Sequence, residues 1–154
     1  MIRKLCLTIS RFALAAWVGA AALFVITSVI EVRSFDSTTR ATLALLRFPA
    51  YYACGFALIA TALITGLAAC TDAARTRRAT KTAMGLIALA LLLMYIDYVW
   101  IYRPMVGMIE IPQAARPAGF QDYHKASMYI NAVDVGCCMI AALLLCWPAN
   151  RSDR

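Results

Sequence analysis

Four long apolar stretches constrain the fold of this chain more than any other feature of its sequence. Each holds about 20 mainly apolar residues, the length that an α-helix needs to cross a hydrocarbon core about 30 Å thick. Two of them contain no charged residue, and the third and fourth contain one aspartate each, Asp97 and Asp134. The predicted spanning helices cover about 13–30, 51–69, 83–102 and 128–147.

The composition agrees with a chain that lies almost wholly in lipid. Of its 154 residues, 63% are hydrophobic, and the mean hydropathy is +0.73, too apolar for a water-soluble domain of this size. No linker or repeat divides it, so we expect one membrane domain over 1–154, an all-α antiparallel bundle of four transmembrane helices. The N-terminal apolar run is longer than the roughly 7 to 15 residues of a signal peptide core, and we assign it as the first spanning helix.

The net charge of +7 does not indicate nucleic acid, because the basic residues flank the apolar stretches. Nine would lie on the side of the two termini, namely Arg3, Lys4, Arg11, Arg75, Arg77, Arg78, Lys81, Arg151 and Arg154. Six would lie on the other side, namely Arg33, Arg40, Arg47, Arg103, Arg116 and Lys125. The positive-inside rule therefore predicts that both termini are cytoplasmic, in a plasma or bacterial inner membrane. The expected partner is the lipid bilayer, and a homo-oligomer or a larger membrane complex is left open.

The two connections on the outer side are predicted to be the longer ones. The segment 31–47 is mixed and polar, with residues suited to a turn and a helix cap. The segment 103–125 contains three prolines, of which Pro104 comes first, so the third helix should kink or end near Tyr102.

The polar residues inside the apolar stretches are the candidates for function. A charged side chain at membrane depth costs roughly 2.5 to 3.5 kcal/mol on insertion scales. In antiparallel helices, Asp97 and Asp134 come to a similar depth and could face each other. On the last helix, His124, Ser127 and Asn131 precede Asp134 at spacings of three, four and three residues, which places all four on one stripe.

These positions predict an outward-facing polar pocket at the outer ends of the helices. One interpretation is structural, with the polar groups joining the helices by hydrogen bonds and ion pairs. The other is a site for a small ligand or cation, since two facing acids can share a proton. The candidate ligand-binding residues are Glu31, Arg47, Asp97, Arg103, His124, Ser127, Asn131 and Asp134.

The residue types of the chain give little indication of a metal or cofactor site. His124 is the only histidine, so one chain cannot supply two histidines to a haem or three to a zinc ion. A metal site would depend on Glu31, Asp97 or Asp134, and we leave it open. No phosphate loop, nucleotide fingerprint or catalytic triad order is present, so no cofactor is expected.

Several local patterns resemble one family. They are Trp17 with Gly19 and the run 20–24, the run 48–52 with Gly55, Tyr102 with Pro104, and Phe120 with His124, Ser127 and Asn131. Together they resemble the transmembrane protein 205-like family of small four-helix membrane proteins, over roughly residues 13–147. That family is largely a domain of unknown function, so the resemblance implies a fold and little chemistry. Asp97 and Asp134 are not part of the shared motifs.

Two functional hypotheses follow, with a third beside them. The first is a non-enzymatic membrane protein that binds or passes a small ligand or cation. The second is an enzyme similar to anthrone oxygenases, which are also small four-helix membrane chains; His124 would be its base, with an aromatic substrate among Tyr51, Tyr98 and Trp100. The third is a structural or assembly subunit, which would leave a small-residue face unpacked.

Overall fold

The computed structural model describes residues 1–70, 78–109, 117 and 119–147, and all its regular elements are helices. The connections and the C-terminal end contain five basic residues and two of the outer prolines, namely Arg75, Arg77, Arg116, Arg151, Arg154, Pro112 and Pro117. Of these, only Pro117 is among the described residues. The elements are α1 (Ile2–Ser34), α2 (Ser37–Ala68), α3 (Arg78–Ile96), the π-helix η1 (Asp97–Tyr102), α4 (Arg103–Ile109) and α5 (Phe120–Cys146).

Four helical segments of the described chain are long and apolar enough to cross a membrane. This confirms the predicted all-helical fold with four candidate spans. Each helix begins before its predicted apolar range, because polar and charged flanking residues continue the same helices, whereas α2 and α5 end one residue earlier than predicted. The four segments are Ile2–Ser34, Ser37–Ala68, Arg78–Met108 and Phe120–Cys146.

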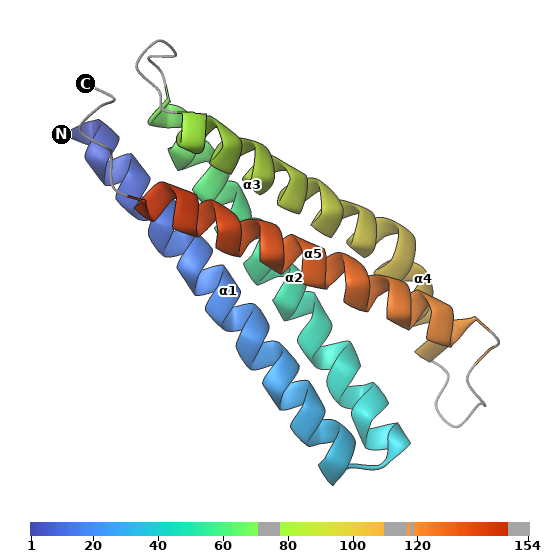
Figure 1. Ribbon diagram of the computed structural model, residues 1–154. Helices are drawn as coiled ribbons and strands as arrows, with labels where there is room; N and C mark the ends of the chain where they lie inside the picture. Colours follow the sequence, from blue (N-terminus) through green and yellow to red (C-terminus); the bar gives the residue numbers. More distant parts are fainter. Residues whose placement is uncertain (71–77, 110–116, 118, 148–154) are drawn as a thin grey trace.

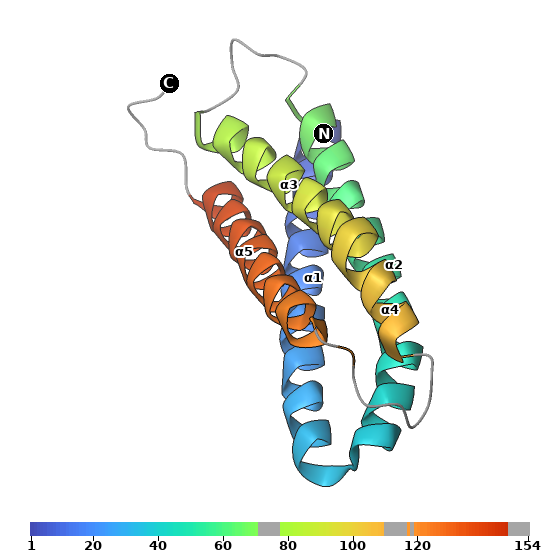
Figure 2. The ribbon, with the colours of Figure 1, turned by 90° about the vertical axis from the view of Figure 1, so that its right-hand side faces the viewer.

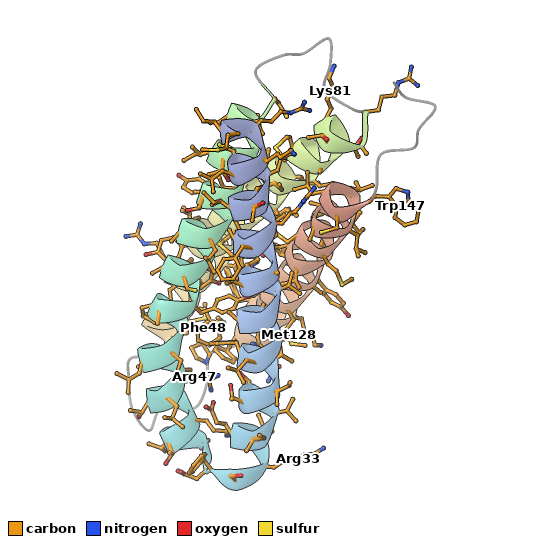
Figure 3. The ribbon with its side chains drawn as sticks, turned by 90° about the vertical axis from the view of Figure 1, so that its left-hand side faces the viewer. Arg33, Arg47, Phe48, Lys81, Met128 and Trp147 are labelled. Atoms are coloured by element: carbon orange, nitrogen blue, oxygen red, sulfur yellow. The ribbon has the colours of Figure 1, made fainter. Side chains whose placement is uncertain are left out.

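The helices form two antiparallel pairs, α1 with α2 and α3 with α5 (Figure 1). Helix α1 begins and helix α5 ends at the same end of the bundle. The two pairs cross at an angle, and the α1–α2 hairpin projects past the first turn of α5 at the opposite end (Figure 2). Figure 3 places Arg33 and Arg47 toward that projecting end and Lys81 toward the other, so basic residues flank the apolar region at both ends.

The connection between α1 and α2 is much shorter than the sequence predicted. Only Phe35 and Asp36 separate the two helices. The Asp36 carboxylate accepts hydrogen bonds from the backbone N–H groups of Thr38 at 3.3 Å and Thr39 at 3.4 Å, and so caps α2. Hydrogen bonding by Thr39 lowers the pKa of this exposed carboxyl. The polar residues of 31–47 thus lie mostly on helices and not in a loop.

The helix that carries Asp97 does not end near Tyr102; its hydrogen-bond pattern changes there instead. Between Asp97 and Tyr102 it is a π-helix, and the N–H of Arg103 donates to the carbonyl of Tyr98, five residues back. Pro104 follows directly and has no N–H to donate, so the wider turn accommodates the position where an α-helical hydrogen bond is lost. The chain then continues as α4 to Ile109.

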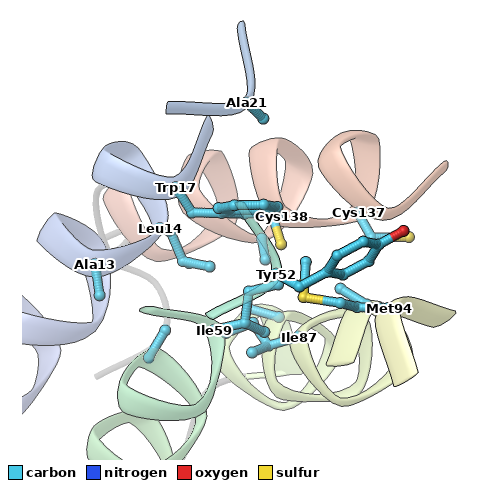
Figure 4. Close-up of a cluster of buried hydrophobic side chains, with 14 of the residues drawn as sticks. Ala13, Leu14, Trp17, Ala21, Tyr52, Ile59, Ile87, Met94, Cys137 and Cys138 are labelled. Carbon is cyan, nitrogen blue, oxygen red and sulfur yellow. The ribbon is translucent and has the colours of Figure 1, made fainter. Parts of the chain in front are cut away.

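The core lies where the two helix pairs meet. Figure 4 shows Trp17 of α1, Tyr52 of α2, Met94 of α3 and Cys138 of α5 converging there, and all four are at most 2% exposed. Gly55 permits this contact, because a Cβ at Gly55 would lie 2.5 Å from Cε of Met94 and 2.7 Å from Cη2 of Trp17. Close approach of helices at small residues is the usual basis of packing in lipid.

Two polar contacts join α1 to its neighbours near the end where α1 begins, one within its own pair and one to the other pair. The hydroxyl of Ser10 donates to the carbonyl of Ala62 on α2 at 2.9 Å. The guanidinium of Arg11 donates to the carbonyl of Leu145 at 2.5 Å, which places a cation at the C-terminal end of α5. These contacts tie α1 to both neighbours.

We expect Gly55→Ala to destabilise the bundle by about 1 to 3 kcal/mol, because the added methyl group overpacks the core against the fully buried Trp17. Gly19→Ala is the matched control, since nothing lies within 4 Å of a Cβ at that position; the better helix propensity of alanine should leave its stability unchanged or raised by up to about 1 kcal/mol. Reversible unfolding in mixed micelles measures both. Equal stabilities of the two variants would contradict the packing described here.

Candidate functional site

The carboxyl group of Asp97 organises the polar interior of the bundle. It is fully buried, and its Oδ2 accepts three hydrogen bonds. Tyr52 on α2 donates at 2.6 Å, Ser127 on α5 donates at 3.1 Å, and the Nδ2 group of Asn131 on α5 donates at 2.7 Å. One carboxyl oxygen on η1 therefore joins three parts of the bundle.

Asn131 is itself held in place by its neighbours. Its Oδ1 accepts a hydrogen bond from the hydroxyl of Tyr51 at 3.0 Å, and its Nδ2 also donates to the carbonyl of Ser127 at 2.9 Å. With Oδ1 acting as an acceptor for Tyr51, the amide directs its donor toward Asp97. Two adjacent tyrosines of α2 thus reach the same cluster, one directly and one through Asn131.

Asp134 lies one helical turn further along α5 and is also buried, at 1% exposure. Its Oδ1 is 4.0 Å from the Sγ of Cys138, a weak donor. The buried indole N–H of Trp17 is near this carboxyl but makes no hydrogen bond of standard geometry with it. No hydrogen bond joins Asp97 to Asp134 directly, because Asn131 occupies the α5 position that contacts Asp97.

Each buried carboxyl keeps one oxygen without a hydrogen-bond partner among the described residues. These atoms are Oδ1 of Asp97 and Oδ2 of Asp134. Buried polar atoms are nearly always paired in native proteins, so two unpaired carboxyl oxygens in one interior are unusual. Such an atom is suited to hold a proton or to contact a cation.

Glu31 and Arg47 form a separate site on the projecting α1–α2 hairpin. Their side chains make an ion pair. The guanidinium of Arg47 also donates to Oγ1 of Thr27 at 2.5 Å and lies 4.6 Å from the ring centre of Phe24. These contacts all stay within the hairpin, so the pair stabilises the outer part of α1 against α2.

Arg103 and His124 do not enter the interior. Arg103 is exposed, and its side chain makes no hydrogen bond or ion pair with the part of the chain that the structure describes. His124 is exposed on the first turns of α5, and its ring stacks on Phe120 at 6.1 Å between centres. The structure thus places the eight predicted residues in different surroundings. Of these eight residues, Asp97, Ser127 and Asn131 are in direct contact with one another, and Glu31 pairs with Arg47 on the hairpin.

The aromatic substrate site suggested for an oxygenase is not assembled either. Trp100 is 70% exposed, so its side chain points out of the bundle. Tyr51 is engaged with Asn131, and Tyr98 packs against Tyr52 and Tyr102. Trp100 thus points away from Tyr51 and Tyr98, which both contact the ring of Tyr52.

Sequence reasoning missed Tyr52, although a signal for it was present. The buried residues of α2 are Tyr52, Gly55, Ile59, Ala62 and Gly66, at spacings of three, four, three and four. That is the same spacing that marked the polar stripe of the last helix. Extending the stripe back from the two buried glycines leads to Tyr52 and not to Tyr51.

A groove lies beside this cluster. We call it the tyrosine groove; it has a volume of about 290 Å³ and lies between α2 and η1. Its lining includes Tyr52, whose hydroxyl contacts Asp97 on the inner side. The groove is lined by Pro49, Tyr52, Ala53, Phe56, Tyr98 and Tyr102.

The described residues contain no group of three or more His, Cys, Asp or Glu side chains that could hold a metal ion.

The sequence matches no protein-family profile, no curated protein and no solved structure. The chemistry of the site must therefore be argued from the geometry of Asp97 and Asp134 and from their neighbours.

We expect Tyr52→Phe to destabilise the protein by about 0.6 kcal/mol and by no more than about 1.7 kcal/mol, the range typical of interhelical hydrogen bonds in membranes. The substitution removes the 2.6 Å hydrogen bond to Asp97 and keeps the ring. Tyr98→Phe is the matched control, because the Tyr98 hydroxyl makes no hydrogen bond to the described residues although its ring packs on the same tyrosine. Unfolding in mixed micelles compares them, and equal losses would contradict the assignment.

Proposed function

We propose that this chain is a non-enzymatic multi-pass membrane protein that binds or passes a small cation inside the bundle, at Asp97 and Asp134, and that this cation is the proton. The observation that supports the proposal most directly is the burial of both carboxyls, each with one unpaired oxygen. Among the described residues, Arg and Lys form an ion pair only at Glu31 and Arg47, away from these acids.

The energetic argument concerns the charge of the two acids. An ionised carboxyl in the hydrocarbon region is costly without a counter-charge, and no basic side chain of the described chain supplies one. A bound proton neutralises the group. The three donors on Oδ2 of Asp97 favour the ionised form, whereas burial favours the neutral form. A carboxyl under these opposing influences is suited to take up and release a proton.

The proposed site is smaller than the outward-facing pocket expected from the sequence. It consists of Asp97 and Asp134, with Tyr52, Ser127 and Asn131 positioning Asp97 by hydrogen bonds. The hairpin pair and the exposed residues at the outer ends of η1 and α5 are not part of it.

We also propose that the chain is a relative of the transmembrane protein 205-like family, with both termini in the cytoplasm of a plasma or bacterial inner membrane. Two residues of the Phe-His-Ser-Asn run, Ser127 and Asn131, are the α5 residues that contact Asp97, which gives this motif a physical role. The excess of basic residues on the side of the termini supports the orientation.

We expect infrared spectra of the protein in lipid nanodiscs to show the C=O stretching band of a protonated, buried carboxylic acid that disappears as the pH is raised. The double variant Asp97→Asn with Asp134→Asn should lose this band, since both titrating groups are gone. Glu31→Gln is the control; it removes a carboxyl that is paired with Arg47 and should leave the band in place. A band that persists in the double variant, or wild-type spectra that do not change with pH, would overturn the proposal.

A further inference from the structure

The tyrosine groove lies on the face of the bundle that α2 and η1 form. It continues along the bundle into a second hollow between α2 and α3, which we call the apolar groove, and Phe56 lines both. The apolar groove has a volume of about 540 Å³, and Leu63, Leu91 and Leu92 are among its walls. The two hollows together suit a molecule with an apolar body and a distinct head group.

Aromatic side chains make up most of the lining of the tyrosine groove. The rings of Tyr52, Tyr98 and Tyr102 all line the tyrosine groove and pack on one another, with ring centres 4.7 to 5.6 Å apart. Phe56 adds an edge contact to Tyr98 at 5.9 Å. The faces of such rings carry negative electrostatic potential and attract cations, including quaternary ammonium groups.

The charges around the groove favour a cation as well. Asp97 lies directly behind Tyr52, joined to its hydroxyl at 2.6 Å, and its Oδ1 has no partner among the described residues. Among the residues that the structure describes, no arginine or lysine lines either groove. An anionic head group would thus face aromatic π-systems and a buried acid without any compensating charge.

We propose that this cleft binds a lipophilic cation, with its ammonium head among Tyr52, Tyr98 and Tyr102 and its apolar part along the apolar groove. The inference rests on the proposed function, because the cation would bind in competition with the proton on Asp97. When the cation binds, Asp97 releases its proton to the solvent and the bound positive charge takes the place of that proton.

The test compares a long-chain trimethylammonium probe with its neutral analogue, in which carbon replaces the ammonium nitrogen, on the full protein in nanodiscs. We expect the radiolabelled cation to bind, the neutral analogue to compete poorly, and binding to weaken as the pH falls. Tyr98→Leu should weaken binding roughly two- to thirtyfold through loss of one ring face, whereas Tyr98→Phe, which keeps the ring, should bind like the wild type. Tyr129→Leu, at a 74% exposed position on α5, controls for loss of a tyrosine elsewhere.

The outcomes separate this inference from the proposed function. Equal binding of the cation and the neutral analogue overturns the inference, and if the infrared band of the two acids still titrates, the proton site stands without it. A binding constant that is unchanged in Tyr98→Leu also overturns it. Cation binding that depends on the ring at position 98 and on pH supports it, and loss of the pH dependence in Asp97→Asn identifies Asp97 as the competing group.

Discussion

A carboxyl group within a hydrocarbon layer needs partners, and the way this bundle provides them to Asp97 determines much of its architecture. One oxygen atom of Asp97 accepts hydrogen bonds from Tyr52 of α2 and from Ser127 and Asn131 of α5. Apolar burial gives helices in lipid little net tendency to associate, so these directional contacts and the close fit at Gly55 hold the pairs together. The second oxygen of Asp97 has no hydrogen-bond partner among the described residues.

The π-helix between Asp97 and Tyr102 carries the buried acid and also lets the helix continue past Pro104. Its wider turn lies directly before Pro104, which cannot donate a backbone hydrogen bond, and it lets the helix continue to Ile109. The same six residues supply Asp97 to the interior and Tyr98 and Tyr102 to the groove. π-helical turns often occur at functional sites, and here one segment contributes both to the acid cluster and to the aromatic surface beside it.

Polar groups that looked like one site in the sequence are separate in the structure. Glu31 and Arg47 stay on the projecting hairpin, where they pair with each other, while Asp97 and Asp134 lie in the shared interior. The apolar groove lies between α2 and α3, and the tyrosine groove lies between α2 and η1. The ion pair therefore lies apart from the acids, and Tyr52 lines one of the two grooves.

The sequence by itself determined the all-helical fold and four candidate membrane spans. The length of an apolar run can be compared with the thickness of a bilayer without any knowledge of the tertiary structure. It also determined that Ser127, Asn131 and Asp134 share one stripe, since helical periodicity is local. Only the tertiary structure decided which of them meets Asp97, that Tyr52 and not Tyr51 contacts it directly, and that Arg103 and His124 stay outside. Those outcomes depend on how the helix pairs pack against each other and on close contacts at positions such as Gly55, which arise between segments that are distant in the sequence. The spacing of the small residues on α2 marks its buried face, but it does not specify which residue of another helix lies opposite.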